Sequence, residues 1–281
     1  MTATIDAFFD AIEQGNVDLV QAMLAERPAW IKQTNEDGLT PLMLAVRCVE
    51  RTPQLVQALI GVGADVNTST HEGYTPLHMM VDVNGPTGTG EIPGQIARLL
   101  VNAGADVEAR QHWGWTPLMH AAIEGTDDAL KALVDAGGKL NEVFPPFTLP
   151  VFLRGRTVLM ATVGRPQKTQ ILIDAGVDVR AVDAHGLTAL ELARICLAEA
   201  GNNRTDCQGT DAMIEASLVA TLKGLKAAGI DPDSPMVGAG MTYRESVEAS
   251  VKELFAKVGK YDYAEQVRRS IAIIEKGMAK Q

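Results

Sequence analysis

The stretch DGLTPLMLAV, residues 37–46, contains the pattern that repeats along most of this 281-residue chain. Its centre is Thr-Pro-Leu, and exact or looser copies (Thr-Val-Leu, Thr-Ala-Leu) stand at 40–42, 75–77, 116–118, 157–159 and 188–190. A threonine hydroxyl accepts hydrogen bonds from the free N–H groups at a helix start, and the φ of a following proline is already helical. The pattern therefore predicts a helix after each threonine, with the leucine facing the core.

A second signal, glycine followed by a short polar and apolar string, runs in step with the first. It appears as GADVN, GADVE, GGKLN and GVDVR at 63–67, 104–108, 137–141 and 176–180. Three of these glycines precede the next threonine by 12 residues. Glycine tolerates the left-handed conformation that ends a helix, so each copy predicts the end of a second helix. One such helix pair cannot bury its apolar face alone, which predicts a stack of repeats.

These motifs resemble the ankyrin repeat. The strings that carry the resemblance are DGLTPLMLAV (37–46), EGYTPLHMMV (72–81), WGWTPLMHAA (113–122), RGRTVLMATV (154–163) and AHGLTALELA (184–193), preceded by a capping repeat over 5–30. The resemblance implies an all-α solenoid of helix-turn-helix-loop units over 1–232, with about six repeats. Residues 233–281 are expected to form a helical hairpin that caps the stack or, alternatively, binds a partner.

Three insertions interrupt the regular spacing, at 84–94, 142–153 and 200–210. The first is rich in glycine and proline, which predicts a loop between two helices. The second holds Phe144, Phe147, Phe152 and three prolines, too rigid for a helix and too apolar for an idle loop. We interpret it as a flap over the concave groove, with a cover between repeats or a contact with a second molecule as alternatives.

Composition narrows the classes of partner and compartment. The net charge of −10 argues against nucleic acid or an anionic membrane surface as the main partner. No apolar run approaches the roughly 20 residues that span a bilayer. The three cysteines, Cys48, Cys196 and Cys207, form no CxxC pair, which favours a reducing cytoplasm over a disulfide frame or zinc site.

By position, the resemblance implies which residues face the concave groove. Loop-tip positions are Glu36, Asp37, Leu39, His71, Glu72, Tyr74, His112, Trp113, Trp115, Leu153, Arg154, Arg156, Ala184, His185 and Leu187. Helix positions on the same side are Arg47, Cys48, Asp82, Val83, Ile123, Glu124, Gly164 and Arg165. Two of the three tryptophans, Trp113 and Trp115, thus stand at tips, and we expect them to be presented rather than buried.

Aromatic rings and guanidinium groups together form the candidate ligand site. Its members are Tyr74, Trp113, Trp115, Phe144, Phe147, Arg154, Arg156, Arg165 and His185. Such a set suits an apolar or aromatic group that carries a negative charge, and it equally suits a protein-binding hot spot. A third interpretation is that the rings pack only against the second insertion and bind nothing.

The histidines divide into structural and chemical candidates. His78 fills the place of the family's TPLH motif that ties adjacent loops together, so we expect a structural role. His120 lies in an otherwise apolar column and is either a satisfied core residue or a ligand contact. The candidates for acid–base chemistry are His112, His120, His71, Asp82 and Glu124. Loop histidines one per repeat lack the tight spacing of a metal site, so we expect neither a metal nor a cofactor.

Two functional hypotheses follow. The first is a binding module that recognises a protein partner through the concave groove and its aromatic and arginine tips. It rests on the repeat pattern and on the absence of linear catalytic signatures. The second is a site for a small aromatic or carboxylate anion under the 142–153 flap, used for binding or for acid–base catalysis. We favour the first, and thus a protein that is not an enzyme.

Overall fold

The structure, a computed structural model, describes residues 4–81, 92–145, 155–183, 186–194 and 263–280, together with 233, 242, 244 and 245. The chain divides into two compact units, Met1–Lys139 and Leu140–Gln281. The predicted 200–210 insertion and the proposed boundary after residue 232 lie outside the described residues and stay predictions. The described part is helical, with two isolated β-bridges and no strand, which confirms the predicted all-α class.

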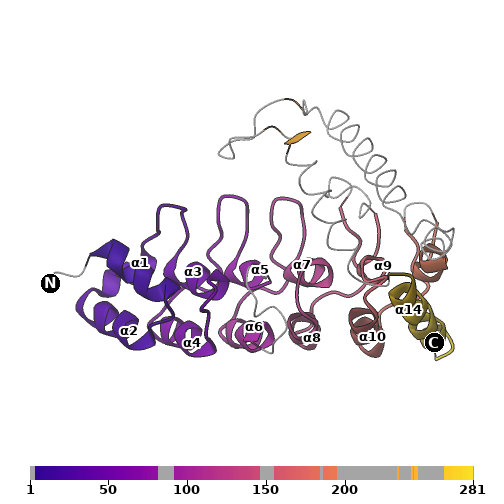
Figure 1. The fold of residues 1–281 in the computed structure, drawn as a ribbon, viewed down its shortest axis with the longest axis horizontal. Helices are drawn as coiled ribbons and strands as arrows, with labels where there is room; N and C mark the ends of the chain where they lie inside the picture. Colours follow the sequence, from indigo (N-terminus) through magenta and orange to yellow (C-terminus); the bar gives the residue numbers. More distant parts are fainter. Residues whose placement is uncertain are drawn as a thin grey trace. The chain divides into compact units, whose positions relative to one another are not determined.

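Unit 1 is a stack of helix pairs. The first helices of the pairs are α1 (Ile5–Glu13), α3 (Pro41–Arg47), α5 (Pro76–Met79) and α7 (Pro117–Ile123). The second helices are α2 (Val17–Glu26), α4 (Pro53–Gly61), α6 (Ile92–Asn102) and α8 (Asp127–Asp135), and a 3-10 turn, η1 (Pro28–Lys32), follows α2. Figure 1 shows the first helices in one row and the second helices in another, with loops rising beside the first row.

The predicted start and stop signals are confirmed. The hydroxyl of Thr40 accepts a hydrogen bond from the Met43 N–H at 3.3 Å, and Thr116 and Thr157 cap their helices in the same way. The leucine two places after each of these threonines is buried. The glycines that follow the second helices have positive φ, between 85° and 93° at positions 63, 104, 137 and 176. The helix bounds thus follow from local chemistry.

A side-chain ladder holds successive repeats in register. The Asn67 carboxamide oxygen accepts the N–H of Asp106 at 2.8 Å, and its amide group donates to the Gly104 carbonyl. One repeat later, Glu108 accepts the N–H of Lys139 at 2.9 Å. In unit 2, Asn141 accepts the N–H of Asp178 at 2.8 Å. The same position of each repeat therefore satisfies a backbone donor of the next, which the GADVN-type strings encode.

The loops before α3, α5 and α7 are short, closed turns that we call finger 1 (residues 33–39), finger 2 (68–74) and finger 3 (109–115). Each is closed at its base by a backbone bond, for example from Thr70 N–H to the Tyr74 carbonyl at 3.0 Å. Fingers 2 and 3 are joined directly, because the His112 N–H donates to the Glu72 carbonyl at 2.8 Å. Fingers 2 and 3 are therefore held in fixed relative positions.

Unit 2 contains α9 (Val158–Ala161), α10 (Pro166–Asp174) and a helix at the carboxyl end, α14 (Tyr263–Met278). Helix α14 packs against α10. The buried hydroxyl of Ser270 accepts the N–H of Gly164 at 3.2 Å and lies 3.4 Å from the buried hydroxyl of Thr169. An exposed ion pair joins Arg194 to Glu275 at 2.9 Å. These contacts attach α14 to α10 and to the turn before it, and the cap over 233–281 stays a prediction.

The second insertion extends a finger loop of unit 2. The Phe144 N–H donates to the Arg156 carbonyl and the Gly155 N–H donates to the Phe144 carbonyl, both at 2.8 Å. These bonds match those at the base of the shorter fingers, so the extra residues enter at the tip. Residues 146–154 lie outside the described part, and the flap stays a prediction.

The loop predicted over 84–94 extends too far toward the carboxyl end. Helix α6 begins at Ile92, so 92–94 form its first turn, and 84–91 lie outside the described residues. Pro93 explains the early start, because its fixed φ suits a first helical turn despite the glycines around it. In the part of the chain that the structure describes, no helix is both long enough and apolar enough to cross a bilayer.

Gly73 tests how closely fingers 2 and 3 approach. A Cβ atom on Gly73 would lie 3.0 Å from the Gln111 Cα, whereas one on Gly38 of finger 1 would meet nothing within 4 Å. Both glycines have positive φ, 80° and 76°. We expect Gly38→Ala to cost about 1 kcal/mol of unfolding free energy from φ strain alone. Gly73→Ala should cost clearly more in urea denaturation, and equal losses would contradict the close approach.

Candidate functional site

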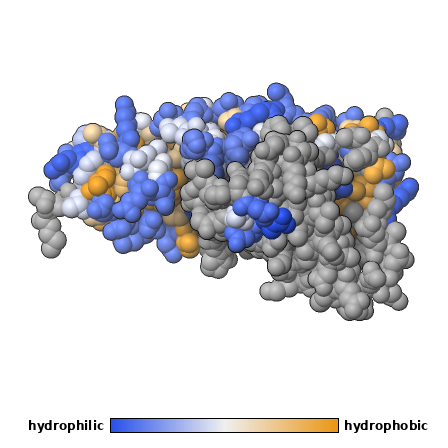
Figure 2. All heavy atoms as spheres, turned by 90° about the horizontal axis from the view of Figure 1, so that it is seen from above, coloured by the Kyte–Doolittle hydropathy of each residue, from blue (hydrophilic) through white to orange (hydrophobic). Residues whose placement is uncertain are grey.

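The candidate site is the surface formed by the fingers and first helices of unit 1. Figure 2 views the molecule from the side of the finger tips, and hydrophilic side chains predominate at the amino-terminal end of unit 1, with smaller apolar patches between them. Asp37, His71, Glu72 and His112 are exposed on fingers 1 to 3, as their positions predicted. Because the helix stack holds the fingers, these side chains are displayed from a fixed backbone.

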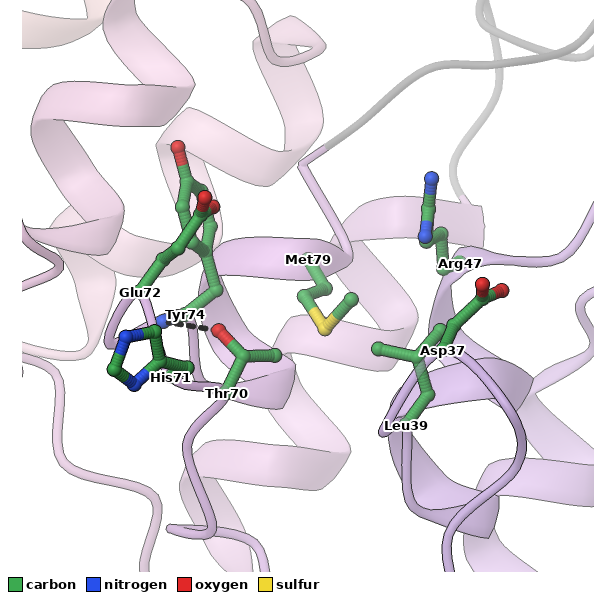
Figure 3. Close-up of a pocket in the computed structure, with 8 residues that line it drawn as sticks. All are labelled: Asp37, Leu39, Arg47, Thr70, His71, Glu72, Tyr74 and Met79. Atoms are coloured by element: carbon green, nitrogen blue, oxygen red, sulfur yellow. Dashed lines mark hydrogen bonds between the residues drawn. The ribbon is translucent and has the colours of Figure 1, made fainter. Parts of the chain in front are cut away.

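A cleft of about 400 Å³ lies between fingers 1 and 2 (Figure 3). The described residues that line it are Asp37, Leu39, Arg47, Thr70, His71, Glu72, Tyr74 and Met79. Met79 of α5 lies at the centre, with Asp37 and Leu39 on one side and Thr70 and His71 on the other. Leu39 and Met79 are 4% and 5% exposed, so the cleft has an apolar floor between polar walls.

The charges of the cleft walls are not neutralised by their neighbours. Asp37 and Glu72 are exposed carboxylates, and Arg47 at the end of α3 is an exposed guanidinium. None of the three forms an ion pair with another described residue. The fold therefore gains little from these charges, and they are available to a ligand.

The prediction that both loop tryptophans are presented is wrong for Trp115. Trp115 is 5% exposed, and its ring packs edge-on against His120 with the centroids 6.0 Å apart. Trp115 is the residue directly before the capping threonine, where the finger returns to the helix and the side chain turns inward. Leu39 in the same position of finger 1 is also buried. Tyr74 in the same position of finger 2 is half-buried, so this position turns the side chain inward without burying it completely in every finger.

Trp113 and its neighbours do stand at the finger surface. Trp113 is half-buried, and its ring centroid lies 4.3 Å from that of the exposed His112. Tyr74 is half-buried at the cleft, and its hydroxyl accepts a weak hydrogen bond from Gln111 at 3.4 Å. The Tyr74 and His112 centroids are 6.3 Å apart, so finger 2 and finger 3 share one row of rings.

His78 has the structural role that the sequence predicted. Its Nδ1 accepts the Thr75 N–H at 3.3 Å, which leaves Nε2 to donate to the Trp115 carbonyl of the next repeat at 3.0 Å. The ring thus joins two repeats as a neutral tautomer. Burial is the main cause that lowers its pKa from 6.5 to about 4. A histidine with both nitrogens engaged and held neutral is not an acid–base catalyst.

His120 is a core residue with one link toward the surface. It is 4% exposed and lies against the rings of Tyr74 and Trp115, with centroids 6.0 Å away in both cases. Its Nε2 is 3.4 Å from the Glu124 carboxylate, whose side chain is 56% exposed. Of the two sequence interpretations, the core role agrees with this burial.

Cys48 is poorly suited to thiol chemistry. Its sulfur lies 3.6 Å from the Ala45 carbonyl and 3.8 Å from the Ile12 carbonyl. Burial raises the pKa of the thiol to about 11, and nearby Arg51 offsets only part of that effect. The thiolate is the nucleophilic form, and a raised pKa keeps the Cys48 thiol almost entirely protonated at neutral pH.

The remaining predicted ligand residues belong to unit 2 or lie outside the described part. Phe144 is fully buried, and its place in a ligand site under the second insertion stays a prediction. It takes the inward position at the base of a finger that Gln111 takes in finger 3. Arg156 and Arg165 are half-buried in unit 2, at the finger base and at the start of α10. The residues outside the described part are Asp82, Phe147, Arg154 and His185.

The pocket that would combine Trp113 with Arg156 therefore stays a prediction, because its members belong to different units. Within the described ranges, no group of three histidine, cysteine, aspartate or glutamate side chains is placed to hold a metal ion. The cleft in unit 1 uses positions that the repeat pattern had placed on the groove side, among them Asp37, Arg47 and Glu72. What the sequence reasoning missed is Met79, whose column looked simply apolar.

A family model of ankyrin repeats in three copies matches residues 8–88, 47–144 and 89–183. Together these matches cover more than half of the chain. The protein belongs to the ankyrin repeat family. Ankyrin repeats are generally protein–protein interaction modules.

Solved structures agree on the fold. An ankyrin repeat domain from Acinetobacter baumannii is 23% identical with a TM-score of 0.53, over 80% of this chain and 98% of that one. The ankyrin repeat protein EF0377 is 22% identical with a TM-score of 0.55, and the match covers 69% of this chain and 94% of EF0377. The ankyrin repeat domain of Bcl-3, a member of the IkappaB family, is 20% identical with a TM-score of 0.54, and the match covers 98% of this chain and 99% of that domain.

Because of the His78 bridge, the free energy of unfolding depends on pH. The folded ring has a pKa of about 4 against 6.5 when exposed, so the unfolded chain takes up the proton first. Neutral His78 makes its whole contribution to the free energy of unfolding above pH 6.5. That contribution decreases by up to about 3 kcal/mol as the pH falls toward 4. We expect His78→Gln to be less stable at pH 7 but to lose less stability on acidification. Identical pH profiles from urea denaturation would contradict this role.

The two tryptophans of finger 3 should differ sharply when truncated. Trp115→Ala removes a buried ring and should cost about 3 kcal/mol or more of unfolding free energy. Trp113→Ala removes a half-exposed ring and should cost less than about 1 kcal/mol. Thermal and urea unfolding of both variants measure the difference. Comparable losses would show that Trp113 also belongs to the core.

Proposed function

We propose that unit 1 binds a protein partner through fingers 1 to 3 and the first helices beside them. The observation that carries the proposal is the row of fingers, in which fingers 2 and 3 are bonded to each other. His112 N–H donates to Glu72, and exposed polar and half-buried aromatic side chains stand along that row. A binding surface of this kind needs many side chains in fixed relative positions, and the repeat register supplies them.

Trp113 is the central anchor in this proposal. Its ring lies against His112 at the tip of finger 3, so it has part of its surface ready for a partner and part fixed by its neighbour. Tryptophan, tyrosine and arginine contribute disproportionately to protein interfaces because they bury a large area with few rotatable bonds. Arg47 and Tyr74 at the neighbouring cleft belong to the same residue classes.

A preformed surface also lowers the cost of binding. Association loses free energy when loops and side chains must be ordered. Here the ladder from Asn67 to Asp106 and the bridge through His78 hold the fingers before any partner arrives. We therefore expect the surface to bind as a rigid body, with changes limited to exposed side chains.

The second hypothesis, a small-molecule or acid–base site under the 142–153 insertion, has weaker support. Trp115 and Phe144 are buried, and His120 has only 4% of its surface exposed. Its other flap residues lie outside the described part of the chain. It stays a separate prediction that binding assays with aromatic and carboxylate anions would address.

Site-specific photo-crosslinking in cells tests the proposed surface. A photo-reactive amino acid placed at His71 or His112 should form a crosslinked protein adduct, because both side chains are exposed on fingers. The same amino acid at Val62, 50% exposed after α4, is the matched control on the second-helix side. We expect Trp113→Ala to reduce the finger adducts by about tenfold, the equivalent of one hot-spot contact.

The stability of each variant is checked first by circular dichroism, so that loss of fold is not mistaken for loss of binding. Leu19→Ala, an exposed apolar truncation on α2, is the control for Trp113→Ala. Equal adducts at Val62 and at the two finger positions would argue against this surface. So would finger adducts that are unchanged by Trp113→Ala.

A further inference from the structure

We propose that the cleft between fingers 1 and 2 takes the lysine or arginine side chain of an extended segment of the partner protein. This inference rests on the proposed function and adds the chemistry of the segment that is recognised. It follows from three properties of the cleft: its volume of about 400 Å³, its apolar floor and its unneutralised carboxylates.

The charges of the residues that line the cleft indicate the sign of the ligand's charge. Among the described residues that line the cleft, Asp37 and Glu72 are carboxylates and Arg47 alone is permanently cationic. The two carboxylates come from facing walls, and neither forms an ion pair with a described residue. Arg47 lies on the same side as Asp37, so the two carboxylates outnumber one guanidinium and the cleft favours a cation over an anion.

The floor decides the shape of the ligand. Leu39 and Met79 are almost completely buried and lie below the charged walls, with the Tyr74 ring beside them. Lysine and arginine carry a long aliphatic stem below the charged head, so they bury methylene groups on such a floor while the head meets carboxylates. A compact inorganic cation would leave the floor uncovered.

The walls also hold groups suited to a peptide backbone. The Thr70 hydroxyl accepts the Tyr74 N–H at 3.2 Å, which leaves its proton available to a carbonyl oxygen. Arg47 is exposed at the end of α3 and can donate to a second carbonyl or to an acidic neighbour in the same segment. An extended peptide therefore matches the cleft better than a free small cation.

The charge of the whole chain favours the same partner. Its net charge is −10, so a basic segment is attracted over a distance before any contact forms. Long-range attraction raises the rate of association, while the cleft selects the residue. The two effects are separable, because the first depends on total charge and the second on Asp37 and Glu72.

Selection from a random linear peptide library displayed on phage, against the full-length chain, tests the inference. We expect enrichment of peptides with lysine or arginine next to an aliphatic residue. A synthetic peptide of the enriched consensus should bind Asp37→Asn/Glu72→Gln at least about tenfold more weakly than the unchanged protein. Free arginine and spermidine should compete only weakly, since neither supplies a peptide backbone.

The matched control is Asp18→Asn/Glu26→Gln, which changes the net charge equally at exposed positions of α2, outside the cleft and the fingers. This control should bind the peptide with nearly unchanged affinity. Charge reversal, Asp37→Lys/Glu72→Lys, should shift the selection toward acidic peptides. Because both residues are exposed, the variants should unfold at the same temperature as the unchanged protein.

Each contrary outcome has a distinct meaning. The inference would be overturned if the selected peptides show no preference for basic residues, or if Asp37→Asn/Glu72→Gln binds them as tightly as the unchanged protein. If Trp113→Ala still weakens binding of these peptides, the proposed binding surface is supported even so. Peptides insensitive to all three substitutions would overturn the proposed function as well. An equal loss of peptide affinity in the cleft variant and the control variant would show that total charge acts alone, which overturns the role of the cleft. The absence of any enriched peptide would overturn that role as well.

Discussion

The fold depends on hydrogen bonds that cross from one repeat to the next. A helix pair such as α5 and α6 is too small to bury its apolar face by itself, so it is stable only against its neighbours. Apolar contact alone would allow the pairs to slide. The Asn67 and Glu108 ladder and the His78 bridge prevent sliding, because each bond satisfies a specific backbone group of the following repeat.

The same register creates the candidate binding surface. Fingers 2 and 3 are bonded through the backbone of Glu72 and His112, so their backbones cannot move independently. Structural and functional roles are thereby divided within each finger. Residues at its base, such as Trp115, enter the core, and residues at its tip, such as Trp113 and His71, remain available.

The chemistry of the histidines follows from this division. His78 and His120 lie on first helices, are buried and serve packing, and the low pKa of His78 is the cost of placing a titratable ring in the core. His71 and His112 lie at finger tips and remain exposed. Histidine content alone does not indicate catalysis in this protein, because location in the repeat determines what each ring can do.

The sequence by itself determined the repeat, because each signal is local. Threonine caps, the leucine that follows and the glycine stops act within a few residues, so the helices were predictable, whereas the structural role of His78 was implied by the resemblance to the ankyrin repeat. Burial of Trp115 and Phe144 and the floor supplied by Met79 were decided by the tertiary structure. They depend on which neighbouring repeat covers a side chain. Such contacts join residues more than thirty positions apart, as the rings of Tyr74 and His120 are, and no local pattern records them.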